Sequence, residues 1–162
     1  MKHLVTLATA ILVYFVATSS ARSFTLNSVS NCGPTYSNGV SFNLDAGAHN
    51  IEWISGAYSL WSSNGFNGGL TWIGWTRAYV HATGEIITFG APASPTWYAT
   101  KALAEAAAVG IHTINLSVAS QVTFYLSDGG GCGDNRGSVT LEFATVPVEN
   151  HTWGSIKALY EQ

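Results

Sequence analysis

The sequence contains few charged residues, and it lacks any cluster of basic ones. Charged residues make up 9% of the 162 residues, with six lysines and arginines against nine aspartates and glutamates. Proteins that bind nucleic acid or anionic lipid present a basic patch that meets the phosphate charges. The composition therefore argues against both kinds of partner and favours neutral or cationic ones. The sequence also shows no repeat and no linker, so we expect a single domain.

Recognisable catalytic motifs are also missing. Serines occur without a Gly-x-Ser-x-Gly elbow, and the histidines beyond the N-terminal segment have neither the His-x-His nor the His-Glu-x-x-His spacing of a zinc site. The glutamates are scattered, and sequence separation does not identify a glycosidase pair. We therefore predict a protein that is not an enzyme. The residues considered are His49, His81, His112, His151, Glu52, Glu85, Glu105 and Glu142.

The N-terminal segment has the pattern of a secretory signal peptide. A short basic start is followed by an apolar run over residues 4–17 and by small residues up to Ala21. This pattern predicts cleavage before Arg22 and a secreted, periplasmic or cell-surface protein without a membrane span in its mature form. An uncleaved anchor is the alternative. The mature chain of about 140 residues is long enough for one folded domain.

Two cysteines, Cys32 and Cys132, lie in the part of the chain that would be exported. Disulfides form and persist in oxidising compartments, and each cysteine stands in a glycine-containing loop. We predict that the two residues pair, which requires the first strand to run beside the last two. Two free thiols are the alternative.

Alternating apolar and polar residues predict an all-β protein. Threonine, valine, isoleucine and aromatic residues fill short segments that are separated by glycine, asparagine and proline, as in a β-sandwich. We predict an antiparallel jelly-roll β-sandwich over residues 22–146 with one inserted helix at 97–109, which starts after Pro95 and Thr96 and ends at Gly110. A C-terminal tail, residues 147–162, would carry a short amphipathic helix. The expected strands are 24–27, 39–44, 50–58, 72–81, 85–89 and the two runs that begin at Val122 and end at Phe143.

The connection between the last two strands has the composition of a cation-binding loop. Asp128, Asp134 and Asn135 stand among five glycines, which can take positive φ and turn main-chain carbonyls inward. Calcium prefers six to eight oxygen ligands from carboxylates, amides and carbonyls. The loop therefore predicts a calcium site, and a plain glycine-rich hairpin with solvated acids is the alternative.

These residues also carry a resemblance to a known family. The pattern FYLSD followed by DNRGSVTLEF resembles the C-terminal strand-loop-strand of the small bacterial calcium-dependent galactophilic lectins. By this resemblance Asp128 matches the first calcium ligand, and Asp134 with Asn135 matches the later pair. Cys132 stands where the family has a threonine ligand, and the loop is one residue shorter.

A second segment extends the likeness. The stretch LDAGAHNIEWISGAYSLW resembles the lectin segment that presents a main-chain carbonyl to the ion, which by position would belong to Leu60, or to Tyr58 in a shifted register. The chain also resembles exported bacterial domains with a GAYSLW motif, an alanine-rich helix and an FYLSD ending. The resemblance to the lectins implies calcium as a cofactor and a glycan as a partner.

Aromatic residues crowd the middle of the chain, and tryptophan faces stack on sugar rings. We predict that Tyr58, Trp61 and Asn64 contact a ligand, with Trp61 as the most exposed aromatic residue. The alternative is that most of these aromatics belong to the core. The leading hypothesis is a secreted, non-catalytic, lectin-like domain with a calcium-binding loop. The rival hypothesis is an exported structural or surface-assembly module in which the loop is only a disulfide-stapled turn and the tail docks a partner.

Overall fold

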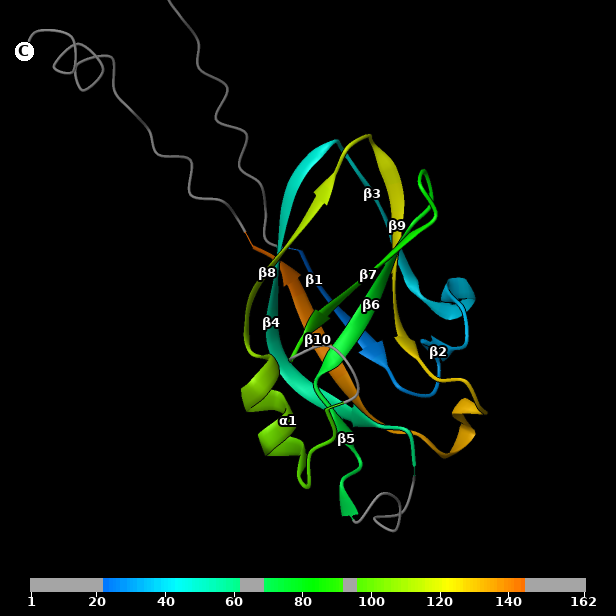
Figure 1. Cartoon of the computed structure of the whole chain (residues 1–162), viewed down its shortest axis with the longest axis vertical. Coiled ribbons are helices and arrows are strands. Elements are labelled where there is room, and N and C mark those ends of the chain that lie inside the picture. The colour runs from blue at the N-terminus through cyan, green and yellow to red at the C-terminus, as the bar shows by residue number, and fades with distance from the viewer. Residues whose placement is uncertain (1–21, 62–68, 92–95, 145–162) are drawn as a thin grey trace, which may run out of the picture.

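The computed structural model describes residues 22–61, 69–91 and 96–144, which form a sandwich of two β-sheets with one helix (Figure 1). The first sheet has the strand order β1-β10-β4-β5, and β8 also pairs with β4. Its strands are β1 (Arg22–Asn27), β4 (Gly47–Ser59), β5 (Trp72–Ile73), β8 (Gly110–Leu116) and β10 (Arg136–Phe143).

The second sheet has the order β2-β9-β6-β7, and β3 also pairs with β9. Its strands are β2 (Cys32–Gly33), β3 (Val40–Leu44), β6 (Trp75–Val80), β7 (Glu85–Gly90) and β9 (Ser120–Ser127). The chain crosses repeatedly between the sheets, and all described pairings are antiparallel except that of β2 with β9. The predicted all-β sandwich is confirmed.

The core fills the space between the sheets and follows the predicted alternation. Val122, Phe124 and Leu126 on β9 are fully buried, as are Val139 and Leu141 on β10. Each such side chain contributes about 1.5–3 kcal/mol when it leaves water. The period-two pattern therefore identifies the core-facing residues of both strands. The prediction of a single buried face is wrong for β9, because Thr123 and Tyr125 on its other face are buried as well.

A fully buried tryptophan sits where β4 bends. Its indole nitrogen, Nε1 of Trp53, donates a hydrogen bond to the carbonyl oxygen of Gly56 at 3.0 Å, and the register between β4 and β10 shifts between Thr140 and Leu141. Gly56 has a φ of 91°, and a Cβ atom there would overlap the carbonyl oxygen of Ser138. This irregularity depends on a glycine, because other residues are strained at that φ.

The inserted helix is shorter than predicted. Helix α1 (Lys101–Ala108) begins four residues after Trp97, because Tyr98 instead pairs with Trp72 in an isolated β-bridge. Thr100 is the N-cap residue of the helix, and its side chain accepts a hydrogen bond from the backbone N–H of Leu103 at 3.2 Å. A threonine cap of this kind satisfies one of the free N–H groups of the first turn.

Two further predictions are wrong, and a glycine is involved in each case. Gly110 does not end the helix but begins β8, a strand that pairs along β4 and that the prediction lacked. The predicted strand 72–81 is two strands, β5 and β6, which are separated at Gly74. A Cβ atom on Gly74 would overlap the carbonyl oxygen of Ala104, so the approach of α1 requires glycine there.

Several predictions fall outside the described residues. These are the signal peptide over 1–21, the ligand contact by Asn64, and the tail over 147–162 with its short helix. Within the described ranges, no helix has the length and apolar character needed to cross a membrane.

Candidate functional site: a loop clipped by a disulfide

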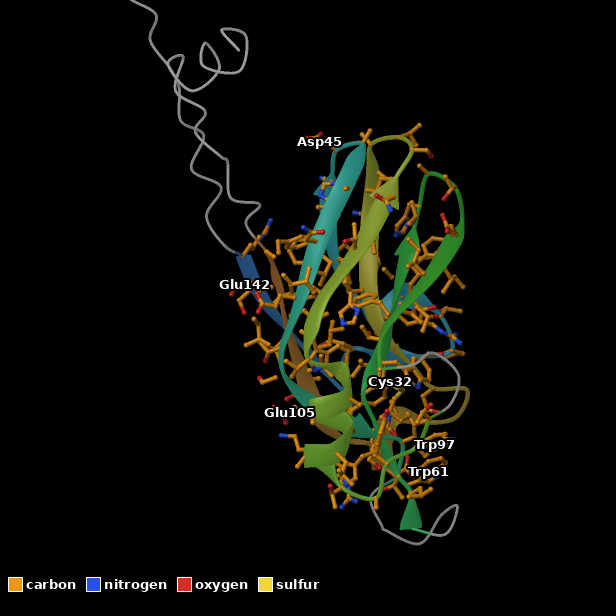
Figure 2. The ribbon with its side chains drawn as sticks, turned by 60° about the vertical axis from the view of Figure 1, so that its left-hand side comes forward. Cys32, Asp45, Trp61, Trp97, Glu105 and Glu142 are labelled. Atoms are coloured by element: carbon orange, nitrogen blue, oxygen red, sulfur yellow. A yellow bond between two sulfur atoms is a disulfide. The ribbon has the colours of Figure 1, made fainter. Side chains whose placement is uncertain are left out.

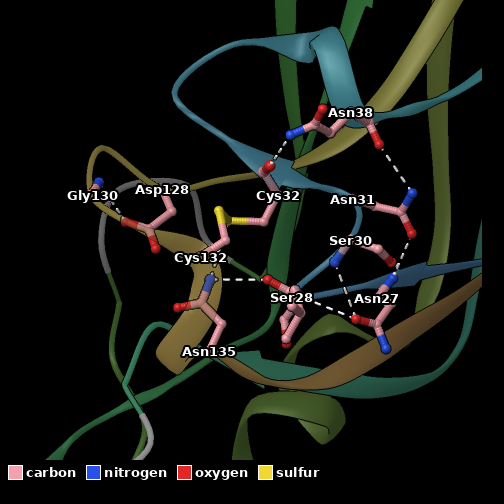
Figure 3. Close-up of a disulfide and its surroundings, with 11 residues drawn as sticks. Asn27, Ser28, Ser30, Asn31, Cys32, Asn38, Asp128, Gly130, Cys132 and Asn135 are labelled. Atoms are coloured by element: carbon pink, nitrogen blue, oxygen red, sulfur yellow. Dashed lines mark hydrogen bonds between the residues drawn. A yellow bond between two sulfur atoms is a disulfide. The ribbon is translucent and has the colours of Figure 1, made fainter.

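The predicted disulfide between Cys32 and Cys132 is confirmed. It joins residues 100 positions apart in the sequence, with their Cα atoms 6.0 Å apart, and it connects β2 to the short 3-10 helix η3 (Cys132–Asp134) in the loop between β9 and β10 (Figure 3). The pairing of β1 with β10 brings the two parts of the chain together, as expected. The glycine- and acid-rich loop is thereby fixed to the segment that follows the first strand.

Backbone hydrogen bonds hold Cys32 in place independently of the sulfur bridge. Cys32 and Gly33 pair in parallel with Leu126 and Ser127 of β9. The backbone N–H of Asp128 donates to the carbonyl oxygen of Gly33 at 3.1 Å, and Nδ2 of Asn38 donates to the carbonyl oxygen of Cys32 at 3.0 Å. The end of β9 and the cysteine loop are therefore one connected structure.

Asparagine side chains shape that cysteine loop. Oδ1 of Asn27 accepts from the backbone N–H groups of Val29 and Ser30, at 2.9 and 3.3 Å. Asn31 accepts from the backbone N–H of Asn27 at 2.8 Å and donates to the carbonyl oxygen of Asn38 at 3.0 Å (Figure 3). Asparagine favours turns because its side chain bonds to nearby backbone groups. The recurrence of asparagine at positions 27, 31 and 38 could have predicted this loop from the sequence, but no prediction was based on it.

Asn135, one of the predicted calcium ligands, is only 7% exposed and lies against the disulfide. Its Nδ2 donates to the carbonyl oxygen of Ser28 at 3.0 Å and to Sγ of Cys32 at 3.1 Å. Its Oδ1 is buried and has no hydrogen-bond partner among the described residues. A buried acceptor without a partner is unfavourable by about 1–3 kcal/mol, so this oxygen is suited to a cation or a donor supplied from outside the chain.

Asp128 lies on the other side of the disulfide. Its Oδ1 accepts a hydrogen bond from the backbone N–H of Gly130 at 2.9 Å, which forms a tight turn at the end of β9. Its carboxylate and the Sγ atoms of both cysteines lie within 4.8 Å of one another. Asp134, the third predicted side-chain ligand, is exposed on η3. The structure therefore brings Asp128 and Asn135 to the disulfide and leaves the Asp134 side chain in solvent.

The predicted carbonyl ligand belongs to the residue that follows β4. Ser59, the last residue of β4, pairs with Arg136, the first residue of β10. Leu60 follows Ser59 and Asn135 precedes Arg136, so both residues lie directly beyond the end of this ladder. Leu60 is half-buried and packs against the core. The two chain segments singled out by the resemblance thus meet at one end of the sandwich.

Tyr58 occupies the core, so its ring is not the exposed platform that the prediction required. The side chain is fully buried, and its ring meets that of Trp75 edge-on at 6.5 Å between centroids. Its hydroxyl has no partner among the described residues. Burial raises the pKa of Tyr58, the nearby positive charge of Arg77 opposes the rise, and the negative charge of Asp128 adds to it. The hydroxyl therefore stays protonated.

Trp61 is half-buried and belongs to an aromatic pair. Its ring lies 4.9 Å from that of Trp97 between centroids, at an interplanar angle of 45°. Figure 2 shows both residues toward the end of the molecule where Cys32 lies, opposite Asp45. The hydroxyl of Ser59 donates to the carbonyl oxygen of Trp61 at 2.9 Å and accepts from its backbone N–H at 3.2 Å. Trp97 was not among the predicted ligand contacts, because its proximity to Trp61 depends on the long-range bridge between Tyr98 and Trp72.

Comparison with models of protein families, with curated proteins and with solved structures finds no match to this chain.

Proposed function

We propose that this chain is an exported, non-catalytic, lectin-like domain. The loop between β9 and β10, which the disulfide holds, would bind calcium. The end of the sandwich that carries Trp61 and Trp97 would bind a glycan. The observation that carries the calcium assignment is the buried Oδ1 of Asn135, an acceptor without a partner among the described residues, on a side chain that contacts the disulfide, which the carboxylate of Asp128 also approaches. Oxygen atoms of amides and carboxylates are the ligands that calcium prefers. The signal-peptide pattern and the disulfide support export.

The proposed calcium ligands are Asp128, Asp134, Asn135 and the main-chain carbonyl of Leu60. The position of Leu60 and Asn135 directly beyond the end of the β4–β10 ladder supports this set, and Asp134, which is exposed, would have to turn toward the loop. The ion would offset the repulsion between the two carboxylates. It would also join the end of β4 to the loop before β10.

The proposed glycan surface is the pair of Trp61 and Trp97, which lies at the same end of the sandwich. Aromatic side chains with hydroxyl and amide neighbours offer an apolar face and hydrogen-bonding edges to a sugar ring. The resemblance to the galactophilic lectins supports a sugar as the ligand, although the fold by itself does not determine function.

Calcium is expected to stabilise the oxidised domain against heat. At a free calcium concentration one hundred times the dissociation constant, binding adds about 2.7 kcal/mol to the free energy of unfolding if the unfolded chain does not bind. Asp128→Asn removes one charge from the loop and should reduce this gain. The melting temperature is measured with calcium and with a chelator for the wild type and the variant.

Glu105→Gln is the control for the calcium experiment, because Glu105 lies on α1 and not in the loop between β9 and β10. The Glu105→Gln variant should keep the full calcium response. Equal calcium-dependent shifts for the two variants would contradict the assignment of the loop.

Glycan binding is expected to require both tryptophans. The oxidised mature domain is applied to a glycan array with calcium and with a chelator, and Trp61→Ala and Trp97→Ala should each weaken the signal at least about fivefold, since loss of a central aromatic anchor removes more than 1 kcal/mol. Trp72→Phe, which preserves an aromatic ring beneath Arg136, serves as the control. Absence of binding to every glycan would overturn the sugar assignment and favour an exported structural module.

A further inference from the structure

Three groups that can bind zinc meet at the disulfide. Sγ of Cys32, Sγ of Cys132 and a carboxylate oxygen of Asp128 lie within 4.8 Å of one another, and Figure 3 shows the three side chains close together. Cysteine thiolates and aspartate carboxylates are both ligands of Zn²⁺, and a water can complete a four-coordinate site. In the oxidised protein the two sulfur atoms are bonded to each other, so they are not available as thiolates.

The three groups are held near one another by contacts that do not depend on the sulfur bond. Cys32 is fixed by its ladder with β9 and by Asn38, and Asp128 is fixed to Gly33 by a backbone hydrogen bond. At η3, before β10, the backbone N–H of Asn135 donates to the carbonyl oxygen of Cys132 at 3.3 Å. None of these bonds involves the sulfur–sulfur bond, so they favour the same arrangement of the ligand groups in the folded, reduced protein.

Asn135 also connects the two halves of the cluster. Its Nδ2 anchors it to the carbonyl oxygen of Ser28, and the same nitrogen donates to Sγ of Cys32. An N–H donor directed at a sulfur orients that sulfur as a ligand, which is the usual role of groups just outside a metal site. Asn135 is therefore a positioning residue for Cys32.

We propose that reduction of the disulfide converts this cluster into a binding site for a thiophilic divalent cation, with Cys32, Cys132 and Asp128 as its protein ligands. A phosphine reductant and one water convert the disulfide into two thiols, and the phosphine becomes its oxide. Zn²⁺ then displaces the two thiol protons as the two sulfur–metal bonds form. The bound ion offsets the repulsion among the two thiolates and the carboxylate that hold it.

This site is separate in chemistry from the proposed calcium site, because it exists only in the reduced protein and uses sulfur. The oxidised chain offers only oxygen ligands at the same place, so the redox state selects the class of cation. Failure of the calcium experiment in the oxidised protein leaves the zinc proposal untouched, and the reverse also holds.

The test is a zinc titration of the phosphine-reduced protein against a chromophoric chelator, with the oxidised protein in parallel. We expect one zinc per chain in the reduced protein, competition with the chelator, and no competition by the oxidised protein. Cobalt substituted for zinc should give a thiolate-to-metal charge-transfer band. Zinc should also raise the melting temperature of the reduced protein, or restore its native circular dichroism where reduction has unfolded it.

Asp128→Asn is expected to weaken zinc binding by the reduced protein at least about tenfold, as loss of a ligand does. Asp45→Asn makes the same chemical change at the opposite end of the molecule and should leave zinc binding unchanged. The proposal is overturned if reduced wild type gives no charge-transfer band, or if reduced Asp128→Asn binds zinc as tightly as wild type. The second result would show that a thiol pair alone, folded or unfolded, holds the ion.

Discussion

Replacing Cys32 and Cys132 together by alanine is expected to lower the free energy of unfolding by about 4–5 kcal/mol. The bridge spans 100 positions of sequence, and the chain-entropy model assigns a closed loop of that length about 4.7 kcal/mol at 25 °C. A typical domain of this size has a total stability of only about 5–15 kcal/mol, so the loss removes a large share of it. Denaturant unfolding of the oxidised wild type and the double variant measures the difference.

Phosphine-reduced, zinc-free wild type is the matched comparison for that experiment. It keeps both sulfur atoms and loses only the cross-link, so it should be as unstable as the alanine variant. A much smaller loss in the reduced protein would assign the effect to packing around the buried Cys32 rather than to the cross-link. A loss below about 1 kcal/mol in both proteins would contradict the entropic account.

Gly56→Ala should be the most damaging of the single glycine substitutions on β4. Gly56 has a φ of 91°, and a new Cβ atom would overlap the carbonyl oxygen of Ser138 on the neighbouring strand. Backbone strain contributes about 1–2 kcal/mol and overpacking a further 1–3 kcal/mol. We therefore expect a loss of about 2–5 kcal/mol in the free energy of unfolding, again measured with denaturant.

Gly47→Ala separates the two contributions, because Gly47 is on the same strand at a φ of 128° with nothing within 4 Å of a Cβ atom. Its loss should be confined to the backbone strain of about 1–2 kcal/mol. Equal losses at the two positions would show that the close approach of β4 and β10 relaxes without penalty.

Local patterns were sufficient to find the residues of a strand that face the core, although they did not predict that β9 is buried on its other face as well. The alternation in β9 and β10 identified Phe124 and Leu141 as core residues, and the sandwich class followed from many such segments. The disulfide also followed, because the predicted export and the count of two cysteines left one intramolecular pairing. These inferences need only the period of a strand and the chemistry of a compartment.

Contacts between distant segments could not be read in the same way. The helix start depended on Tyr98 pairing with Trp72, and the break at Gly74 depended on the approach of α1. The burial of Tyr58 results from its place on a strand with neighbours on both sides. Likewise, the bond from Asn135 to Ser28 joins residues 107 positions apart, and neither residue type predicts the other.

β8 was missed for a different reason. Its residues, GIHTINL, follow an alanine-rich helix directly, so the glycine at its start was interpreted as a helix end. The strand is recognisable only through its ladder with β4, which runs from Gly47 paired with Leu116 to Trp53 paired with Gly110. The intrinsic strand propensity of these residues is a weak signal, and it is their pairing with β4 that makes them a strand.

The bond between Cys32 and Cys132 turns most of the domain into a covalent ring, and the two strands outside that ring pair with each other. β1 precedes the ring and β10 follows it, and the two pair from Arg22 with Phe143 to Asn27 with Ser138. A protease that cuts the backbone once between the cysteines therefore leaves a single molecule of unchanged mass apart from one added water. The fragments would separate only after reduction, so an intact band on a non-reducing gel does not prove an uncut chain.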